Sequence, residues 1–86
     1  MANHESAQKR ARQTIRRTAR NRHLRSTVRT YVKRLREALA SGDRAAAELQ
    51  LKDCVARIDK AVQKGLFHRN TGSRTVSRLS SQVAKL

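Results

Sequence analysis

The chain has 86 residues, of which 21 are Lys or Arg and six are Asp or Glu, so its formal net charge is +15. This length gives room for one domain, and with one Tyr, one Phe and no Trp the core is small. The single Cys54 excludes an internal disulfide and suits a reducing compartment. No apolar run approaches the ~20 residues of a membrane span. The composition therefore favours a small intracellular domain with a polyanionic partner.

The charge is unevenly distributed along the chain. Residues 1–36 hold twelve cations and one acid, residues 37–64 hold five of each, and residues 65–86 hold four cations and no acid. We therefore expect the two ends to face the polyanion, and the neutral middle to face water or other protein.

The first part of the chain predicts one long helix over about residues 6–40, because it contains no Pro or Gly before residue 42. Asn3 or Ser6 is the expected N-cap. From Leu24 onward, apolar residues recur at helical spacing as far as Leu39. The same face carries only polar residues before Leu24. The N-terminal half is thus expected to project without packing, on a helix roughly 50 Å long.

Two corners delimit the remaining helices, expected over about 43–64 and 70–86. Gly42 suits the end of the first helix and Asp43 the N-cap of the second. Gly65 suits a Schellman-like stop, and Asn70 is the expected N-cap of the third helix. Gly72 should weaken that helix by up to about 1 kcal/mol. The expected fold is a single all-α domain over residues 1–86, an antiparallel three-helix bundle with a long projecting basic N-terminal helix.

No catalytic or metal-binding pattern is present. The three His residues, at positions 4, 23 and 68, form no metal-binding motif. Cys54 lies on an apolar stripe and is interpreted as a buried structural thiol. His68 could cap a helix or donate to a phosphate, and the sequence leaves both readings open. We expect no enzyme activity, no cofactor, no metal and no small-molecule substrate.

The cations indicate nucleic acid. Arg outnumbers Lys fifteen to six, and guanidinium groups bind phosphate bidentately. The hydroxyl residues between the cations are expected to bond phosphate or sugar oxygens. Too few aromatic residues are present for a single-strand stacking surface, so recognition of backbone and shape is favoured. Three alternative interpretations remain. The first is a DNA-compacting protein. The second is a membrane-surface helix, which would need an apolar face in the basic segment, and the third is a transit peptide, whose removal would cut a continuous helix.

Three blocks of the sequence are similar to a known family. They are Met1-Ala2-Asn3-x-x-Ser6-Ala7-x-Lys9-Arg10, Gly42-Asp43-x-Ala45-Ala46-Ala47 and Lys64-Gly65-Leu66-Phe67-His68-Arg69-Asn70-x-x-Ser73-Arg74-x-x-Ser77-Arg78-Leu79. In this order and at these separations, they resemble the bacterial small-subunit ribosomal protein S-twenty family over the whole chain. The departures are Gly72, where the family usually has Ala, and Thr75-Val76, where a basic pair is typical.

The resemblance implies a three-helix bundle that binds 16S ribosomal RNA directly and early in assembly of the small subunit, in the cytoplasm. It implies a position joining the 5′ domain to the long penultimate stem, with few protein contacts and no membrane. Charge and resemblance together give these candidate RNA-binding residues: Asn3, Ser6, Lys9, Arg10, Arg12, Arg16, Arg17, Arg20, Asn21, Arg22, Arg25, Arg29, Lys64, His68, Arg69, Asn70, Arg74 and Arg78.

Overall fold

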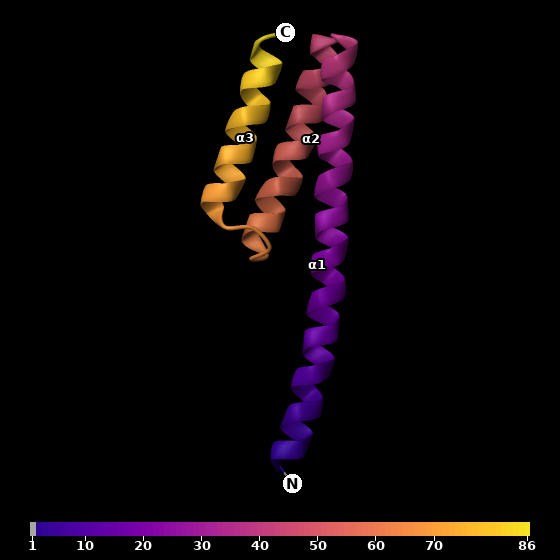
Figure 1. Cartoon of the computed structure of the whole chain (residues 1–86), viewed down its shortest axis with the longest axis vertical. Coiled ribbons are helices and arrows are strands. Elements are labelled where there is room, and N and C mark those ends of the chain that lie inside the picture. Colours follow the sequence, from indigo (N-terminus) through magenta and orange to yellow (C-terminus); the bar gives the residue numbers. More distant parts are fainter. Residues whose placement is uncertain (1) are drawn as a thin grey trace.

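The computed structural model describes residues 2–86, with side chains from His4 onward. It contains the helices α1 (Ala2–Ser41), α2 (Arg44–Gln63) and α3 (Arg69–Ala84), and no strand within the described residues. α1 and α3 run in the same direction and α2 runs between them in the opposite one (Figure 1). The N-terminal half of α1 extends well past the other helices, so that the molecule measures 62 × 21 × 13 Å. The predicted all-α bundle with a long projecting first helix is confirmed.

The α1–α2 corner forms as its residues predict. Gly42 takes the left-handed conformation, with φ of 74°, directly after the end of α1. The Asp43 carboxylate then accepts a hydrogen bond of 3.2 Å from the amide of Ala46 and caps α2. These two residues reverse the chain within a single turn, which places α2 beside the C-terminal half of α1.

The α2–α3 corner is a Schellman motif. Gly65 has φ of 77°, and its amide donates to the carbonyl of Val62 at 3.0 Å, while the Leu66 amide donates to the carbonyl of Ala61 at 2.9 Å. Leu66 and Phe67 pack their side chains partly against the core. This corner therefore has a fixed shape, which matters because it carries several of the predicted RNA-binding residues.

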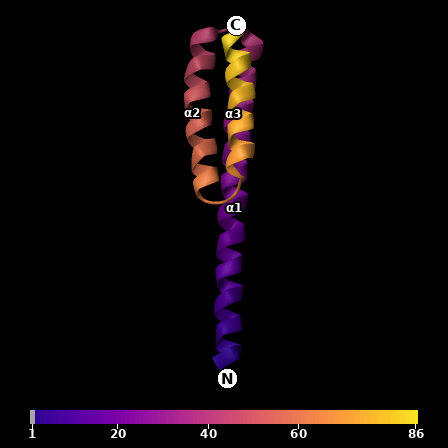
Figure 2. The same cartoon turned by 90° about the vertical axis from the view of Figure 1, so that its left-hand side faces the viewer.

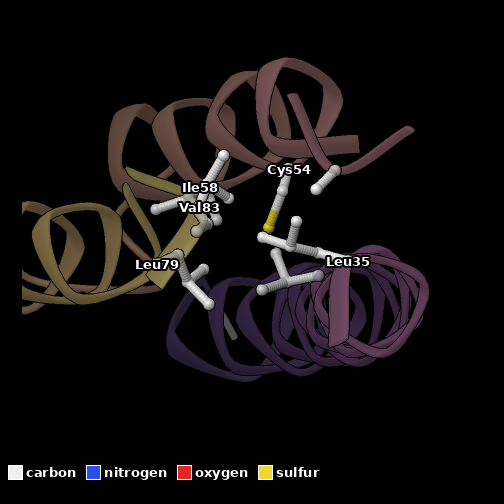
Figure 3. Packing of buried hydrophobic residues seen from close by; sticks show 8 residues of the cluster. Leu35, Cys54, Ile58, Leu79 and Val83 are labelled. Atoms are coloured by element: carbon white, nitrogen blue, oxygen red, sulfur yellow. The ribbon is translucent and has the colours of Figure 1, made fainter. Parts of the chain in front are cut away.

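The core is a narrow apolar column shared by the three helices. Its buried members are Val28 and Leu35 from α1, Ala47, Cys54, Ile58 and Ala61 from α2, and Leu79 and Val83 from α3. Figure 3 shows Leu35, Cys54, Ile58, Leu79 and Val83 converging from the three helices. Burial of each large side chain stabilises the fold by roughly 1.5–3 kcal/mol. All of this burial lies at residue 28 or beyond, so the core supports only the C-terminal half of α1 (Figure 2).

Gly72 has a packing role that helix propensity did not indicate. It is buried, and a Cβ atom placed on it would lie 2.6 Å from Cγ2 of Val62. The missing side chain thus allows the first turns of α3 to approach the last turns of α2 closely. Gly72 thus lowers the helix propensity of α3, but it also permits this close contact between α2 and α3.

Several predicted boundaries are wrong by a few residues. α1 begins at Ala2 and not near residue 6, because Ala2 and the acidic Glu5 suit a first helical turn; Ser6 is therefore interior and not an N-cap. The N-cap of α3 is His68 and not Asn70. α3 ends at Ala84 and not at residue 86, and Leu86 lies beyond its end with 42% of its surface exposed.

Candidate nucleic-acid interface

The N-terminal half of α1 is a free, exposed rod. Every side chain from His4 to Arg20, here called the arm, is exposed. Even Ile15, the arm's one large aliphatic residue, is 69% exposed. The predicted site residues in the arm are Ser6, Lys9, Arg10, Arg12, Arg16, Arg17 and Arg20. Asn3 falls within α1, but its side chain lies outside the described residues. The prediction that packing stops near residues 21–24 is confirmed.

The arm's cations have no acidic partners. Among the described residues, the one ion pair is Arg44 with Glu48, at 3.1 Å, at the far end of the bundle. Glu5 is the single acid before residue 37. Repulsion along the arm is therefore uncompensated within the protein, and an external polyanion would relieve it.

The cations of α1 form two stripes. Gln13, Arg16, Arg17 and Arg20 line a shallow hollow along the arm. A second hollow, farther along the helix, is lined by Thr18, Asn21, Arg22, Arg25, Ser26 and Arg29. Arg16 and Arg25 are nine residues apart, so they project on opposite sides of the helix, about 180° apart.

The stripes change sides for a packing reason. Residues that follow the arm stripe at helical spacing are Leu24 and Tyr31; both are half-buried, and Tyr31 contacts Arg57 of α2. Cations at these two positions would be drawn toward the core, where an unpaired charge is strongly disfavoured. Within the bundle, Arg22, Arg25 and Arg29 accordingly occupy the opposite, exposed side. Asn21, at the transition, is half-buried.

The α2–α3 corner lies where the arm leaves the bundle. An Nη of Arg20 donates to the carbonyl of Lys64, the C-cap of α2, at 3.5 Å, and to Oδ1 of Asn21 at 3.4 Å. The corner cations are thus adjacent to the base of the arm and remote from its tip: Arg10 is about 15 Å farther along the helix than Arg20. The structure brings Arg20 and Lys64 together, but it does not bring the arm tip to the corner.

His68 has the capping role that was one of its two readings. Its Nδ1 accepts a hydrogen bond of 3.1 Å from the amide of Asn70. In the neutral ring the proton therefore lies on Nε2, and this nitrogen is still able to donate to a phosphate. Both readings can hold together, because they use different ring nitrogens.

The remaining corner residues form an exposed basic edge. Arg69 and Asn70 occupy the first turn of α3, and Arg74 and Arg78 follow, four residues apart, on an exposed face. The first amides of a helix favour anions, and here cations surround them without a single acid in residues 65–86. This edge can bind phosphate groups as the arm can.

Three threonine hydroxyls of α1 are hydrogen-bonded within their own helix. The hydroxyls of Thr14, Thr27 and Thr30 each donate at 2.9 Å to the backbone carbonyl four residues earlier. Phosphate oxygens only accept hydrogen bonds. In this conformation each hydroxyl already donates its one proton to a backbone carbonyl, so it has none left for a phosphate. Their free lone pairs can instead accept from a ribose 2′-hydroxyl, which DNA lacks.

Sequence reasoning missed one charged cluster. The guanidinium carbons of Arg34 and Arg57 lie 5.2 Å and 5.0 Å from the ring centroid of Tyr31. Arg57 comes from α2, in the segment expected to be electrostatically neutral. Tyr31 and Arg57 are 26 positions apart in the sequence, so their contact can be found only when the register of α2 against α1 is known.

Nothing in the described residues resembles a catalytic or metal centre. No group of three or more His, Cys, Asp or Glu side chains is placed to hold a metal ion among residues 4–86. Cys54 is buried, and this burial raises the pKa of its thiol, which keeps it protonated and unreactive. The predicted structural role of Cys54 is confirmed. In the part of the chain that the structure describes, no helix has both the length and the apolarity to cross a bilayer.

Known proteins match this chain along nearly its whole length. The family described as "Ribosomal protein S20" matches residues 2–84. A "Small ribosomal subunit protein bS20" from Citrifermentans bemidjiense is 51% identical over all of this chain and 99% of its own length. One from Koribacter versatilis is 54% identical over 96% of this chain and 93% of its own. The chain therefore belongs to the ribosomal protein S20 family, which makes it a structural component of the cytoplasmic ribosome and not an enzyme.

Proposed function

We propose that this protein binds 16S ribosomal RNA directly in the small ribosomal subunit. In this role it links the 5′ domain to the long penultimate stem and helps the subunit to assemble. The observation that carries the proposal is the exposed arm, with six cations and one acid between His4 and Arg20. The names of its relatives, small ribosomal subunit proteins, support the same partner.

A linking role follows from cations on separate surfaces. The stripe containing Arg16 and the stripe containing Arg25 face opposite sides of α1, so one RNA backbone cannot cover both. The edge with Arg69, Arg74 and Arg78 provides a third basic surface at the end of the bundle. A rod placed between phosphate backbones reduces their mutual repulsion and fixes their spacing. The candidate residues named from the sequence remain our proposed contact set, and residues 1–86 are proposed to act as one domain.

Binding of this kind should be strongly salt-dependent. For roughly ten phosphate contacts, log K should fall with log salt at a slope of about −7 to −9. Titrations of the full chain against the transcribed 5′ domain of 16S ribosomal RNA, at several salt concentrations, measure this slope. A duplex DNA of equal length is the matched control. Parity between the RNA and the DNA would favour a DNA-compacting protein and contradict the proposal.

The linking role has a separate test. The 5′ domain and a transcript of the penultimate stem are mixed with and without the protein, and their association is followed by native gel or sedimentation. We expect a complex of both RNAs only when the protein is present. If each RNA binds the protein but excludes the other, direct binding stands and the link is wrong.

A further inference from the structure

Tyr31 brings two arginines from different helices together. Arg34, one turn farther along α1, and Arg57, from α2, both lie against its ring, at 5.2 Å and 5.0 Å from the centroid. An Nη of Arg57 also donates to the Tyr31 hydroxyl at 3.4 Å. Tyr31 is half-buried, whereas both arginines are exposed. The ring is thus a fixed base for two exposed guanidinium groups.

These two charges have no acidic partner. No carboxylate lies within 4.0 Å of either, since Arg44–Glu48 is the one ion pair among the described residues. The separation of the guanidinium carbons cannot exceed the sum of their two distances to the ring. Attraction to the ring offsets part of the repulsion between them, and an anion that contacts both would offset more of it.

Stacking leaves the hydrogen-bonding groups of the arginines available. A guanidinium that contacts an aromatic ring through its face keeps its N–H donors at its edge. The side chain of Arg34 has no hydrogen bond to another described residue, and that of Arg57 has only the one to Tyr31. Both can therefore donate to a phosphate while remaining stacked, and their side chains need little further ordering to do so.

Acceptors for ribose lie next to the pair. A shallow hollow is lined by His23, Ser26, Thr27, Thr30, Tyr31 and Arg34. The hydroxyls of Thr27 and Thr30 donate to their own helix and offer only lone pairs outward. One side of Tyr31 thus presents phosphate donors, and the adjoining hollow presents acceptors suited to a 2′-hydroxyl.

We propose that Arg34 and Arg57, held by Tyr31, form an RNA phosphate site at the α1–α2 seam, with the ribose over the hollow beside Thr27 and Thr30. The inference rests on the proposed RNA binding and adds a surface of α2 to it. Arg34 is five helical turns beyond Arg16 and projects on the same side, about 27 Å farther along. RNA that follows the arm stripe can therefore continue past the base of the arm to this seam, on the side opposite Arg25.

The test uses the fact that Tyr31 is the protein's only tyrosine. Full-length protein labelled with 13C in its tyrosine ring gives one set of ring signals. It is titrated with the 5′ domain of 16S ribosomal RNA, and the affinity and salt slope are measured in parallel for Arg57→Gln. Arg44→Gln is the matched control. It removes the same charge from another exposed position of α2, where the arginine pairs with Glu48.

We expect the Tyr31 ring signals to shift on RNA binding. Arg57→Gln should weaken binding about 3- to 10-fold and make the salt slope shallower by about 0.7–0.9, the value for one phosphate contact. Arg44→Gln should change affinity less than about twofold. A melting curve of each variant separates binding from loss of fold, and Arg34→Gln gives a second measurement should Arg57→Gln fail to fold.

The outcomes separate the two proposals. If the unmodified protein does not bind the RNA, the proposed function fails. If it binds with unchanged Tyr31 signals, and Arg34→Gln and Arg57→Gln behave as Arg44→Gln does, direct binding stands and the seam site is wrong.

Discussion

The two halves of α1 share one helix but differ in everything that holds a helix in place. From Val28 onward its apolar face is buried against α2 and α3, and Leu35 is completely buried. From His4 to Arg20 no side chain is even half-buried. The bundle half is stabilised by the protein itself. The arm depends on backbone hydrogen bonds alone, which barely sustain an isolated helix of this length, and its charges oppose it. The difference fits our proposal that the arm binds RNA, and it shows that only the other half of α1 contributes to the core.

The comparison predicts that binding depends on charge in the arm far more than on charge in the bundle. Reversing Arg10 and Arg17 to Glu together should weaken binding to the 5′ domain of 16S ribosomal RNA by about 100-fold or more, because two phosphate contacts become repulsions. The measurement is the dissociation constant at one fixed salt concentration.

The control reverses Arg44 and Lys52 to Glu, both exposed residues of α2 outside the proposed contacts. It makes the same change in net charge, but it should weaken RNA binding less than about tenfold, because these residues act on the RNA only through the long-range electrostatic field. Equal losses in the two double variants would mean that only net charge matters, and the distinction between arm and bundle would be lost.

The same comparison predicts different dynamics in the free protein. Amides of residues 4–20 should exchange with solvent rapidly, whereas those around Leu35 and Ile58 should be protected by the packed core. Addition of RNA should slow exchange in the arm at least about tenfold, as a segment ordered by its partner behaves. Hydrogen exchange read by NMR, residue by residue, measures both states. Slow exchange of the arm without RNA would show that it is stable alone and contradict the prediction.

A smaller effect is expected inside the bundle, at the contact between Gly72 and Val62. Gly72→Ala gains helix propensity but brings a Cβ to 2.6 Å from Cγ2 of Val62. We expect a net loss of about 1 kcal/mol in the free energy of unfolding, because overpacking typically costs about 1–3 kcal/mol and helix propensity returns up to about 1 kcal/mol. Urea unfolding of the free protein measures it.

The control for this contact is the double variant Gly72→Ala, Val62→Ala. Removing the two methyl groups of Val62 makes space for the new Cβ, so Gly72→Ala should stabilise the protein when measured against Val62→Ala alone. RNA affinity should stay within about twofold, since neither residue is among the proposed RNA contacts. Destabilisation by Gly72→Ala in both backgrounds would show that Val62 is not the cause.

Much of the fold could be predicted because its signals are local in sequence. Gly42 with Asp43, and Gly65 with Leu66, mark the corners through their own backbone requirements. The spacing of Leu24, Val28 and Leu35 and the polar residues before them set where packing stops. The exposed cations of the arm follow from the same pattern. Each of these inferences uses only residues within a few turns of one another.

Some of what could not be predicted depends on distances between helices, and some on local hydrogen bonds. Tyr31 and Arg57 meet only because α1 and α2 pack in one particular register, and Gly72 is close to Val62 only because α3 returns along α2. Capping was one of the two readings of His68, but the sequence favoured Asn70 as the N-cap of α3, because a hydroxyl, carboxylate or amide oxygen is more usual there than a ring nitrogen. The sequence also did not show that the hydroxyls of Thr14, Thr27 and Thr30 donate to their own helix.

The continuity of α1 through the point where Arg20 meets Lys64 has a geometric consequence. Because no flexible joint separates the arm from the bundle, the rotational phase of every arm side chain is inherited from the residues packed around Leu35. Inserting a single alanine between Asn21 and Arg22 would leave the charge and the order of the cations unchanged, yet it would rotate the whole arm by about 100° relative to the α2–α3 corner. Seven added residues would return the phase almost to its starting value while moving the tip about 10 Å outward. The number of residues between the two halves is therefore itself a functional quantity, which no count of charges records.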